Sequence, residues 1–261
     1  MIRAFLVFGR LLKNYQGLTC TKHNIPHFCI MHRFYANNLD IESILVELNE
    51  IESTHACKVL RLKIGDIIEV FNGTGMIALA QIENNHAKRC SIKILSVEQH
   101  EKQPGSVHIA ICPTKSSDRF EWFLEKAVEI GVDEITPLHS ENSERSKLNY
   151  ERLDKIMMSA VKQSQRLYVP ILNPLAKVSE FIKSNPNCLM AHCNSKMNRI
   201  EIMSIPKIGR STIMIGPEGD FSEKEIQQAI EQKINSVSLG KNRLRTETAG
   251  VVAATLLKQW I

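Results

Sequence analysis

The sequence predicts an α/β protein in two parts, a small β-barrel followed by a parallel sheet with helices on both of its faces. Three observations support this fold class. Residues 64–97 hold short apolar strands separated by turn residues, whereas apolar strands alternate with helical stretches after residue 105. The chain has 261 residues, of which 43% are apolar and 23% charged, so it can bury a core and is unlike a disordered or collagen-like chain.

The predicted barrel rests on three strands and one hairpin turn. Strands are expected at residues 67–71, 76–80 and 91–95. The first two flank the segment Asn-Gly-Thr-Gly at 72–75, a strong hairpin signal because asparagine and glycine tolerate the left-handed backbone that such turns need. We therefore expect a β-barrel over residues 31–104.

The chain changes character at the polar segment 101–105, whose proline and glycine mark the domain boundary. Over residues 105–261 strands and helices alternate, which is typical of a parallel sheet covered on both faces. Gly131 stands where a helix C-cap is expected. The expected strands are residues 107–111, 135–138, 188–193, 212–215 and 236–239. The expected helices are residues 118–130, residues 150–166, one that begins at Ser222 and one that begins at Thr246.

Most of the excess positive charge lies in the first thirty residues. The chain has 33 basic and 28 acidic residues, a formal net charge of +5. Residues 1–30 contain four basic residues and no acidic one, so the remaining 29 basic and 28 acidic residues leave a net charge of +1. This segment is either an acid-poor targeting sequence with an apolar cluster at 5–8, or a mis-annotated or disordered N-terminal extension ahead of a true start at Met31. We favour the second interpretation.

The seven cysteines predict reduced thiols in a cytoplasmic protein, because their number is odd and no Cys-x-x-Cys pair occurs. Cys188, His192 and Cys193 form the one cluster that resembles metal ligands, and they lack a fourth ligand, so no metal is expected. No run of 18 apolar residues is present, so no membrane-spanning helix is expected.

The first of two glycine-bearing loops has the sequence Ile-Gly-Pro-Glu-Gly-Asp-Phe-Ser at 215–222 and leads from a buried strand into a helix. Ser222 and Glu225 form a capping box that fixes the start of this helix. A glycine at the carboxyl end of a parallel strand lets a ligand approach the backbone closely. The same residues also fit an ordinary strand-to-helix turn, and the dinucleotide-binding fingerprint is absent.

The second loop, at 238–250, leaves a strand through a glycine, passes a short basic segment and enters a helix. Thr246 suits the N-cap of that helix, and Glu247 in its first turn complements the helix dipole. Small residues at positions 249, 250, 253 and 254 keep one side of the helix thin. Ordinary helix packing accounts for these small residues. Their number beside a basic loop nevertheless favours an unusually close approach of the helix backbone to its neighbour.

Together these loops, Ile-Gly-Pro-Glu-Gly-Asp-Phe-Ser and Leu-Gly-x-x-Arg-Leu-Arg-Thr-Glu-Thr-Ala, resemble the motifs of the RsmE family. Members of this family use S-adenosylmethionine to methylate N3 of one uridine (uracil 1498) in 16S ribosomal RNA. The resemblance extends over nearly all of residues 31–261, with further similar segments at 59–66, 118–132, 143–146 and 163–166. It begins near Met31, which agrees with a start at that residue.

The resemblance implies a SPOUT-type catalytic domain, in which the C-terminal part of the parallel sheet forms a trefoil knot, preceded by a PUA-like β-barrel that binds RNA. It implies S-adenosylmethionine as the cofactor, 16S rRNA of the small ribosomal subunit as the partner and a homodimer, with the helix of small residues and Phe221 as packing elements. The implied cofactor-binding residues are Leu189, His192, Ile215, Gly216, Pro217, Glu218, Gly219, Ser238, Leu239, Gly240, Leu244, Arg245, Thr246 and Glu247.

For catalysis we expect Arg245, Arg243 and Glu218 to act on the uracil. Uracil N3 carries a proton at neutral pH, so transfer requires its loss, and a guanidinium stabilises the negative charge that develops on the carbonyl oxygens. Glu218 or Glu247 either accepts the proton or braces the loops. Asp220 and the pair at 242–243 depart from the family pattern, which favours Arg245 over Arg243.

Five arginines are expected to contact RNA because they fall in segments similar to the family: Arg33, Arg61, Arg119, Arg145 and Arg166. With a net charge of only +1 outside residues 1–30, affinity must come from local patches and from the shape of an assembled particle. Two alternatives stay open at this point. One is a non-catalytic RNA-binding factor for ribosome assembly, and the other is a methyltransferase that acts on a different RNA.

Overall fold

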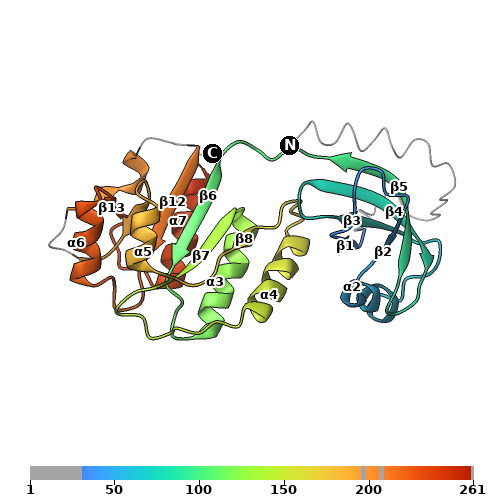
Figure 1. Cartoon of the computed structure of the whole chain (residues 1–261), viewed down its shortest axis with the longest axis horizontal. Helices are drawn as coiled ribbons and strands as arrows, with labels where there is room; N and C mark the ends of the chain where they lie inside the picture. Colours follow the sequence, from blue (N-terminus) through green and yellow to red (C-terminus); the bar gives the residue numbers. More distant parts are fainter. Residues whose placement is uncertain (1–30, 195–197, 206–208, 260–261) are drawn as a thin grey trace, which may run out of the picture. The chain divides into compact units, whose positions relative to one another are not determined.

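The computed structural model describes residues 31–194, 198–205 and 209–259. The expected N-terminal extension, residues 1–30, lies outside this part of the chain. The described strands form a five-stranded sheet and an eight-stranded sheet (Figure 1). No helix among the described residues is long and apolar enough to span a membrane.

The N-terminal sheet has the strand order β1-β3-β4-β5-β2 and packs around its own apolar core. Its strands are β1 (Arg33–Tyr35), β2 (Leu45–Glu47), β3 (Ile67–Phe71), β4 (Met76–Asn84) and β5 (Ser91–Gln99). The expected hairpin is confirmed, because β3 and β4 are antiparallel and flank the turn at 72–75. The short helix α2 (Glu50–Thr54) and the π-helical turn after it (His55–Val59) were not predicted.

The second sheet has the order β11-β13-β10-β12-β6-β7-β8, with β9 paired to β7, and every pairing in it is parallel. Its strands are β6 (Ser106–Ile111), β7 (Glu134–His139), β8 (Ile171–Leu172), β9 (Ala176–Lys177), β10 (Leu189–Ala191), β11 (Ile200–Glu201), β12 (Arg210–Ile215) and β13 (Asn235–Ser238). Its helices are α3 (Ser117–Ile130), α4 (Tyr150–Gln163), α5 (Val178–Ser184), α6 (Glu223–Glu231) and α7 (Thr246–Lys258).

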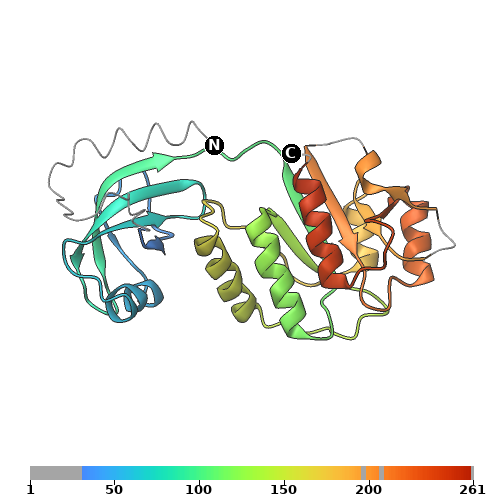
Figure 2. The same cartoon turned by 180° about the vertical axis from the view of Figure 1, so that it is seen from behind.

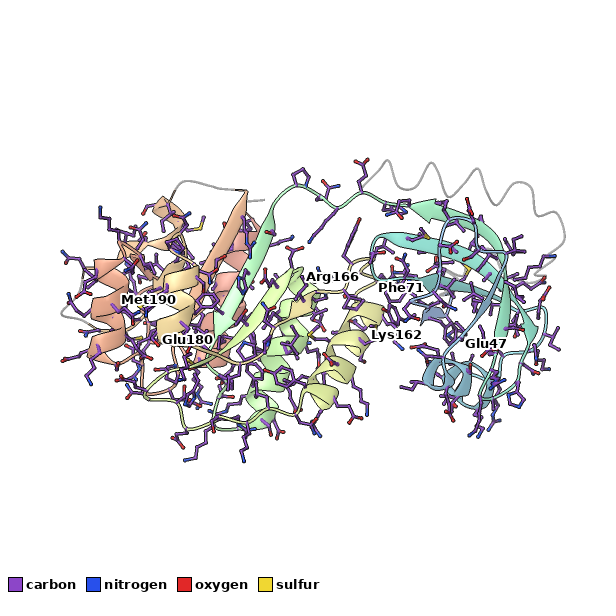
Figure 3. All side chains as sticks on the ribbon, viewed as in Figure 1. Glu47, Phe71, Lys162, Arg166, Glu180 and Met190 are labelled. Carbon is purple, nitrogen blue, oxygen red and sulfur yellow. The ribbon has the colours of Figure 1, made fainter. Side chains whose placement is uncertain are left out.

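Helices cover both faces of this parallel sheet, as expected. The helices α3, α4 and α7 lie on one face (Figure 2), and α5 and α6 lie on the other. Successive strand residues point to opposite faces, so Ile109 and Ile111 join the core under α3 and α7, whereas Ala110 and Cys112 join the core under α5 and α6. Met190, labelled in Figure 3, belongs to this second core.

The helix of small residues packs within the chain. A Cβ atom on Gly250 would lie 2.6 Å from the Phe123 ring and 2.8 Å from the Ile111 side chain, so only glycine allows α7 to approach α3 and β6 this closely. Ala253 and Ala254 are fully buried on the same side of α7. Their packing partners are therefore α3 and β6 of the same chain, and Phe221 is likewise only 4% exposed.

Several boundaries differ from the expectation. Strands β4 and β5 run four residues further than expected, to Asn84 and Gln99. The strand expected at 188–193 covers only Leu189–Ala191, because the polypeptide turns out of the sheet at His192. The helix expected at 150–166 ends at Gln163. Two residues later, Gln165 adopts a left-handed backbone with φ of +58°, which a helix cannot continue through. Strands β8, β9 and β11 have two residues each and helix α5 has seven. None of these four was expected, because each is too short for a recognisable period.

Candidate active site

A cavity of about 280 Å³ lies where three neighbouring strands end. Strand β10 is hydrogen-bonded to β12 on one side and to β13 on the other, all in parallel. Because parallel strands finish at the same edge of a sheet, the loops that follow them meet and enclose the cavity. Eleven of the fourteen expected cofactor residues line it: His192, Ile215, Gly216, Pro217, Glu218, Ser238, Leu239, Gly240, Leu244, Arg245 and Thr246.

The loop after β12 takes its shape from Gly216 and Asp220. A Cβ atom on Gly216 would lie 3.1 Å from the Phe221 ring, which would have to move aside. Asp220 has a left-handed backbone with φ of +65°, a conformation that aspartate tolerates better than most residues. The expected capping box is confirmed, because the side chains of Ser222 and Glu225 each accept the backbone N–H of the other residue.

The start of α7 differs from the expectation. The N-cap is Arg245, with an extended backbone, and Thr246 is the first helical residue, so the prediction that Thr246 caps the helix is wrong. The buried Thr246 hydroxyl instead donates a hydrogen bond to the carbonyl oxygen of Gly216 at 3.1 Å. Thr246 therefore ties the loop after β13 to the loop after β12.

The turn after β10 places a buried histidine in the wall of the cavity. His192 is 4% exposed, and neither ring nitrogen has a hydrogen-bond partner among the residues that the structure describes. Burial lowers the pKa of the imidazole below its ordinary value, an effect that Asp220 opposes and Arg199 reinforces. The neutral ring carries one donor and one acceptor, and both nitrogens are buried without a partner among the described residues.

Five charged side chains line the cavity: Arg199, Glu218, Asp220, Arg243 and Arg245. The Glu218 carboxylate accepts the backbone N–H of Lys115 at 3.0 Å, and Arg243 donates to the Glu218 carbonyl oxygen at 3.4 Å. Arg245 is exposed and forms no side-chain hydrogen bond or ion pair with any described residue. The cavity lining thus includes a guanidinium without a partner among the described residues and a carboxylate that the backbone of Lys115 holds in place.

Three expected cofactor residues do not line the cavity. Leu189 is buried in the core beneath it, and Gly219 faces Asn142 of the loop after β7. Glu247 is 7% exposed, with Oε1 3.9 Å from Arg119 Nε and Oε2 without a partner among the described residues. It belongs to the packing of α7 near α3, whereas Glu218 lies in the cavity.

Sequence reasoning missed several cavity residues, of which Cys193, Arg199, Asp220 and Asn242 carry polar groups. Asp220 was visible only as a departure from the family pattern. Arg199 lies in a segment without any periodic pattern, so nothing in the local sequence marked it.

The five expected RNA-contacting arginines fall into two groups. Arg33 and Arg166 are held inside the protein: Arg33 pairs with Glu69 at 2.8 Å, and Arg166 (Figure 3) donates to two carbonyl oxygens at the end of α3. Burial lowers the pKa of the Arg166 guanidinium below its ordinary value. Arg61 and Arg119 are exposed and Arg145 is half-buried, with one bond to the Lys115 carbonyl oxygen.

Within residues 31–194, 198–205 and 209–259 no group of three or more His, Cys, Asp or Glu side chains is placed to hold a metal ion. Cys188 is buried and Cys193 is exposed.

Comparison with known proteins identifies the family. The sequence model of an RNA methyltransferase domain matches residues 101–258, and that of an RNA methyltransferase PUA domain matches residues 48–95. The chain is 32% identical to the ribosomal RNA small subunit methyltransferase E of Rickettsia conorii, over 85% of this chain and 93% of the relative.

Solved structures of similar proteins share the fold. A probable rRNA methyltransferase from Porphyromonas gingivalis is 37% identical, with a TM-score of 0.80 over 88% of this chain and 98% of the other. A ribosomal RNA small subunit methyltransferase E from Neisseria gonorrhoeae, bound to S-adenosyl methionine, is 30% identical, with a TM-score of 0.76 over 88% and 97% of the two chains. The chain therefore belongs to the RNA methyltransferase family that contains the ribosomal RNA small subunit methyltransferases E.

Proposed function

We propose that this protein transfers the methyl group of S-adenosylmethionine to N3 of a uridine in 16S ribosomal RNA. The observation that carries the proposal is the cavity at the ends of β10, β12 and β13, which joins the loops of both family motifs. Its lining residues include His192, whose buried ring nitrogens lack the partner that buried polar groups normally find, and the exposed Arg245, whose guanidinium pairs with no described residue.

The lining of the cavity suits a nucleoside cofactor in its chemistry. The cavity volume of about 280 Å³ is close to the lower end of the range for small-molecule sites. Apolar side chains of Ile215, Leu239 and Leu244 offer contacts to a base, and His192 offers one donor and one acceptor. When bound, the cofactor supplies an electrophilic methyl group on its sulfonium.

The residues of this chain would supply alignment and electrostatics for the transfer. The uracil N3 proton leaves to a carboxylate or to solvent. Two carboxylates line the cavity, and we assign this role to Glu218, because both oxygens of Asp220 already accept backbone N–H groups. As that proton leaves, negative charge spreads onto the uracil carbonyl oxygens, where the Arg245 guanidinium stabilises it. Glu247 lies outside the cavity lining, so we assign it a bracing role.

RNA binding in this proposal relies on Arg61, Arg119 and Arg145, whose side chains reach the surface. With almost balanced charge outside residues 1–30, the assembled small subunit is the preferred substrate, because its shape adds to a weak electrostatic attraction. The proposal also includes a homodimer and a cytoplasmic location, where small subunits are assembled.

Nucleoside mass spectrometry tests the proposal directly. Small-subunit RNA from a deletion strain should lose 3-methyluridine at one site and regain it when the gene is restored. Unchanged 3-methyluridine together with loss of another methylated nucleoside would indicate a different RNA target.

Two measurements on the purified protein complete the test. S-adenosylmethionine should raise the thermal unfolding midpoint, and its failure to do so would favour a non-catalytic RNA-binding factor. In a methyl-transfer assay at matched salt, assembled small subunits should react faster than naked 16S RNA. Equal rates would contradict the role assigned to the assembled particle.

A further inference from the structure

One peptide unit in the cavity wall, between His192 and Cys193, is held at both ends by charged side chains. The carbonyl oxygen of His192 accepts a hydrogen bond from Arg199 Nη1 at 2.7 Å. The N–H of Cys193 donates to Asp220 Oδ2 at 2.8 Å. Hydrogen bonds with one charged partner are stronger than neutral ones, so this peptide is fixed in orientation more firmly than an ordinary turn.

The two charged residues come from different parts of the chain, and both line the cavity themselves. Asp220 belongs to the loop after β12 and Arg199 to the segment before β11. The other oxygen of Asp220 accepts the N–H of Phe221 at 2.9 Å, and Asn142 donates to its carbonyl oxygen at 3.1 Å, so the carboxylate is itself held in place. A residue so constrained can set the position of a neighbouring loop.

The side chain that this peptide carries is the buried His192 imidazole. Both ring nitrogens lack a partner among the described residues, although the ring is only 4% exposed. A buried polar group without a partner is costly, and a ligand in the cavity would relieve that cost.

We propose that Arg199 and Asp220 are positioning residues, which clamp the His192–Cys193 peptide so that the His192 imidazole hydrogen-bonds the nucleoside cofactor. This inference rests on the proposed function, since it takes S-adenosylmethionine as the ligand of the cavity. Orienting the donor and acceptor before binding lowers the entropy that binding must overcome, which tightens the complex.

Asp220→Gly tests the clamp with little risk to folding, because glycine adopts the left-handed backbone of this position more readily than aspartate. The matched variants are His192→Phe, which keeps a buried ring and removes both nitrogens, and Asp220→Gly with His192→Phe together. Lys241→Ala, an exposed change in the loop after β13, is the control. The dissociation constant of S-adenosylmethionine is measured by calorimetry, and amide hydrogen exchange of Cys193 is followed in the free protein.

We expect Asp220→Gly to weaken binding by about 3- to 10-fold, the loss of one net hydrogen bond, and to speed exchange at Cys193. Against the His192→Phe background the same change should leave the dissociation constant unaltered, because no imidazole remains to be positioned.

An equal loss in both backgrounds, or binding by Asp220→Gly as tight as in the unaltered protein, would overturn the clamp. Failure of the unaltered protein to bind S-adenosylmethionine would instead overturn the proposed function, so the two are distinguished.

Discussion

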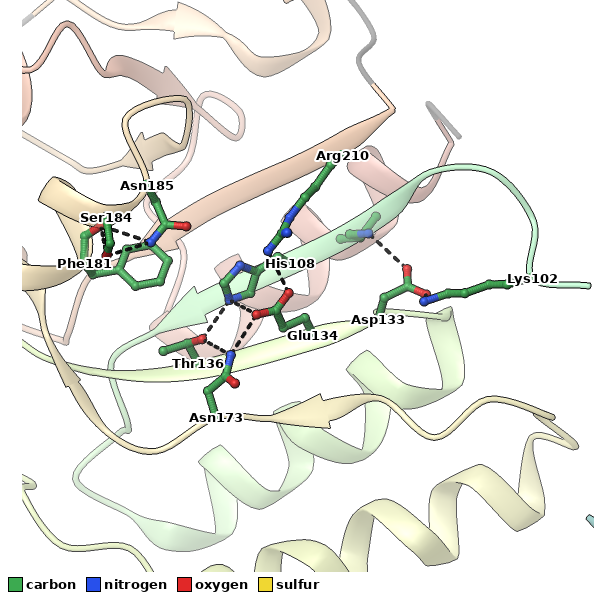
Figure 4. A network of polar contacts seen from close by, with 11 residues as sticks. Lys102, His108, Asp133, Glu134, Thr136, Asn173, Phe181, Ser184, Asn185 and Arg210 are labelled. Atoms are coloured by element: carbon green, nitrogen blue, oxygen red, sulfur yellow. Dashed lines mark hydrogen bonds and ion pairs between the residues drawn. The ribbon is translucent and has the colours of Figure 1, made fainter. Parts of the chain in front are cut away.

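Two polar clusters lie at opposite ends of the same parallel sheet, and they differ in how completely their side chains are paired. At the amino ends, His108 Nε2 lies 2.7 Å from the Thr136 hydroxyl (Figure 4). The Asn173 amide donates to Thr136 and to Glu134 at 2.8 Å each, and Arg210 donates to Glu134 at 2.9 Å. Within this network, only His108 Nδ1 is buried without a partner.

At the carboxyl ends most polar residues of the cavity are also paired, but two side chains are not. Both ring nitrogens of His192 lack a partner among the described residues, and the Arg245 guanidinium makes no side-chain bond there. Pairing inside a protein satisfies buried polar groups and stabilises the fold, whereas unpaired groups retain their capacity to bind a ligand. The difference indicates that the amino ends serve the stability of the sheet and the carboxyl ends serve function.

The largest expected effect is that of Arg245→Ala. The rate of methyl transfer in a single-turnover assay should fall about 100- to 1,000-fold, as when one charge-stabilising group is removed from other active sites. The unfolding midpoint should change little, because Arg245 pairs with no described side chain. The dissociation constant of S-adenosylmethionine should change less than the rate, because the proposal assigns the guanidinium to the uracil. Full activity in this variant would contradict the role of Arg245, and Lys241→Ala serves as the control.

The second effect concerns the paired cluster and depends on pH. Burial lowers the pKa of His108 from 6.5 to about 4; Glu134 opposes this shift and Arg210 reinforces it. The unfolded chain therefore takes up a proton near pH 6.5, while the folded chain does so only near pH 4. The free energy of unfolding is therefore highest above pH 6.5. It falls by about 3 kcal/mol as the pH decreases from 6.5 to below 4.

Denaturant unfolding from pH 7.5 to 4 measures this loss. His192 also has a lowered pKa and contributes in the same direction, so the test is the difference between the unaltered protein and His108→Gln. We expect the variant to depend less on pH, with methyl transfer at neutral pH nearly unchanged. Identical pH dependence in both proteins would assign the acid sensitivity to other groups.

Local patterns made much of this arrangement predictable from the sequence. The capping box of Ser222 and Glu225 follows from a short local motif. Most of the cavity lining was expected from the resemblance of the two loops to the RsmE family. The bond between Asp220 and Cys193 joins residues 27 positions apart, and no local rule connects them. Thr246 has a residue type that suits an N-cap, yet its hydroxyl bonds a distant carbonyl oxygen, because tertiary contacts override a weak local preference.

The third prediction examines Glu225, a paired group in the first turn of α6. The Glu225 carboxylate accepts the Ser140 hydroxyl at 2.7 Å, the Glu141 N–H at 3.1 Å and the Ser222 N–H at 2.8 Å, and it is 5% exposed. Glu225→Gln replaces one acceptor oxygen by a donor, so the free energy of unfolding should fall by about 1–2 kcal/mol. The affinity for S-adenosylmethionine should fall only slightly. If Glu225→Gln kept its stability but bound S-adenosylmethionine much more weakly, the hydrogen bonds of Glu225 would also serve ligand binding.

The smallest expected effect is at Thr246. Its hydroxyl is paired, as in the cluster around His108, and the residue also lines the cavity. Thr246→Val keeps the shape of the side chain and leaves the Gly216 carbonyl oxygen without its donor, so stability should fall by about 1 kcal/mol. Thr246→Ser keeps the hydroxyl and should lose less. If S-adenosylmethionine restores the unfolding midpoint of Thr246→Val more than that of Thr246→Ser, the ligand supplies what the hydroxyl supplied. Equal restoration in the two variants would indicate that Thr246, like the network around His108, serves the stability of the fold.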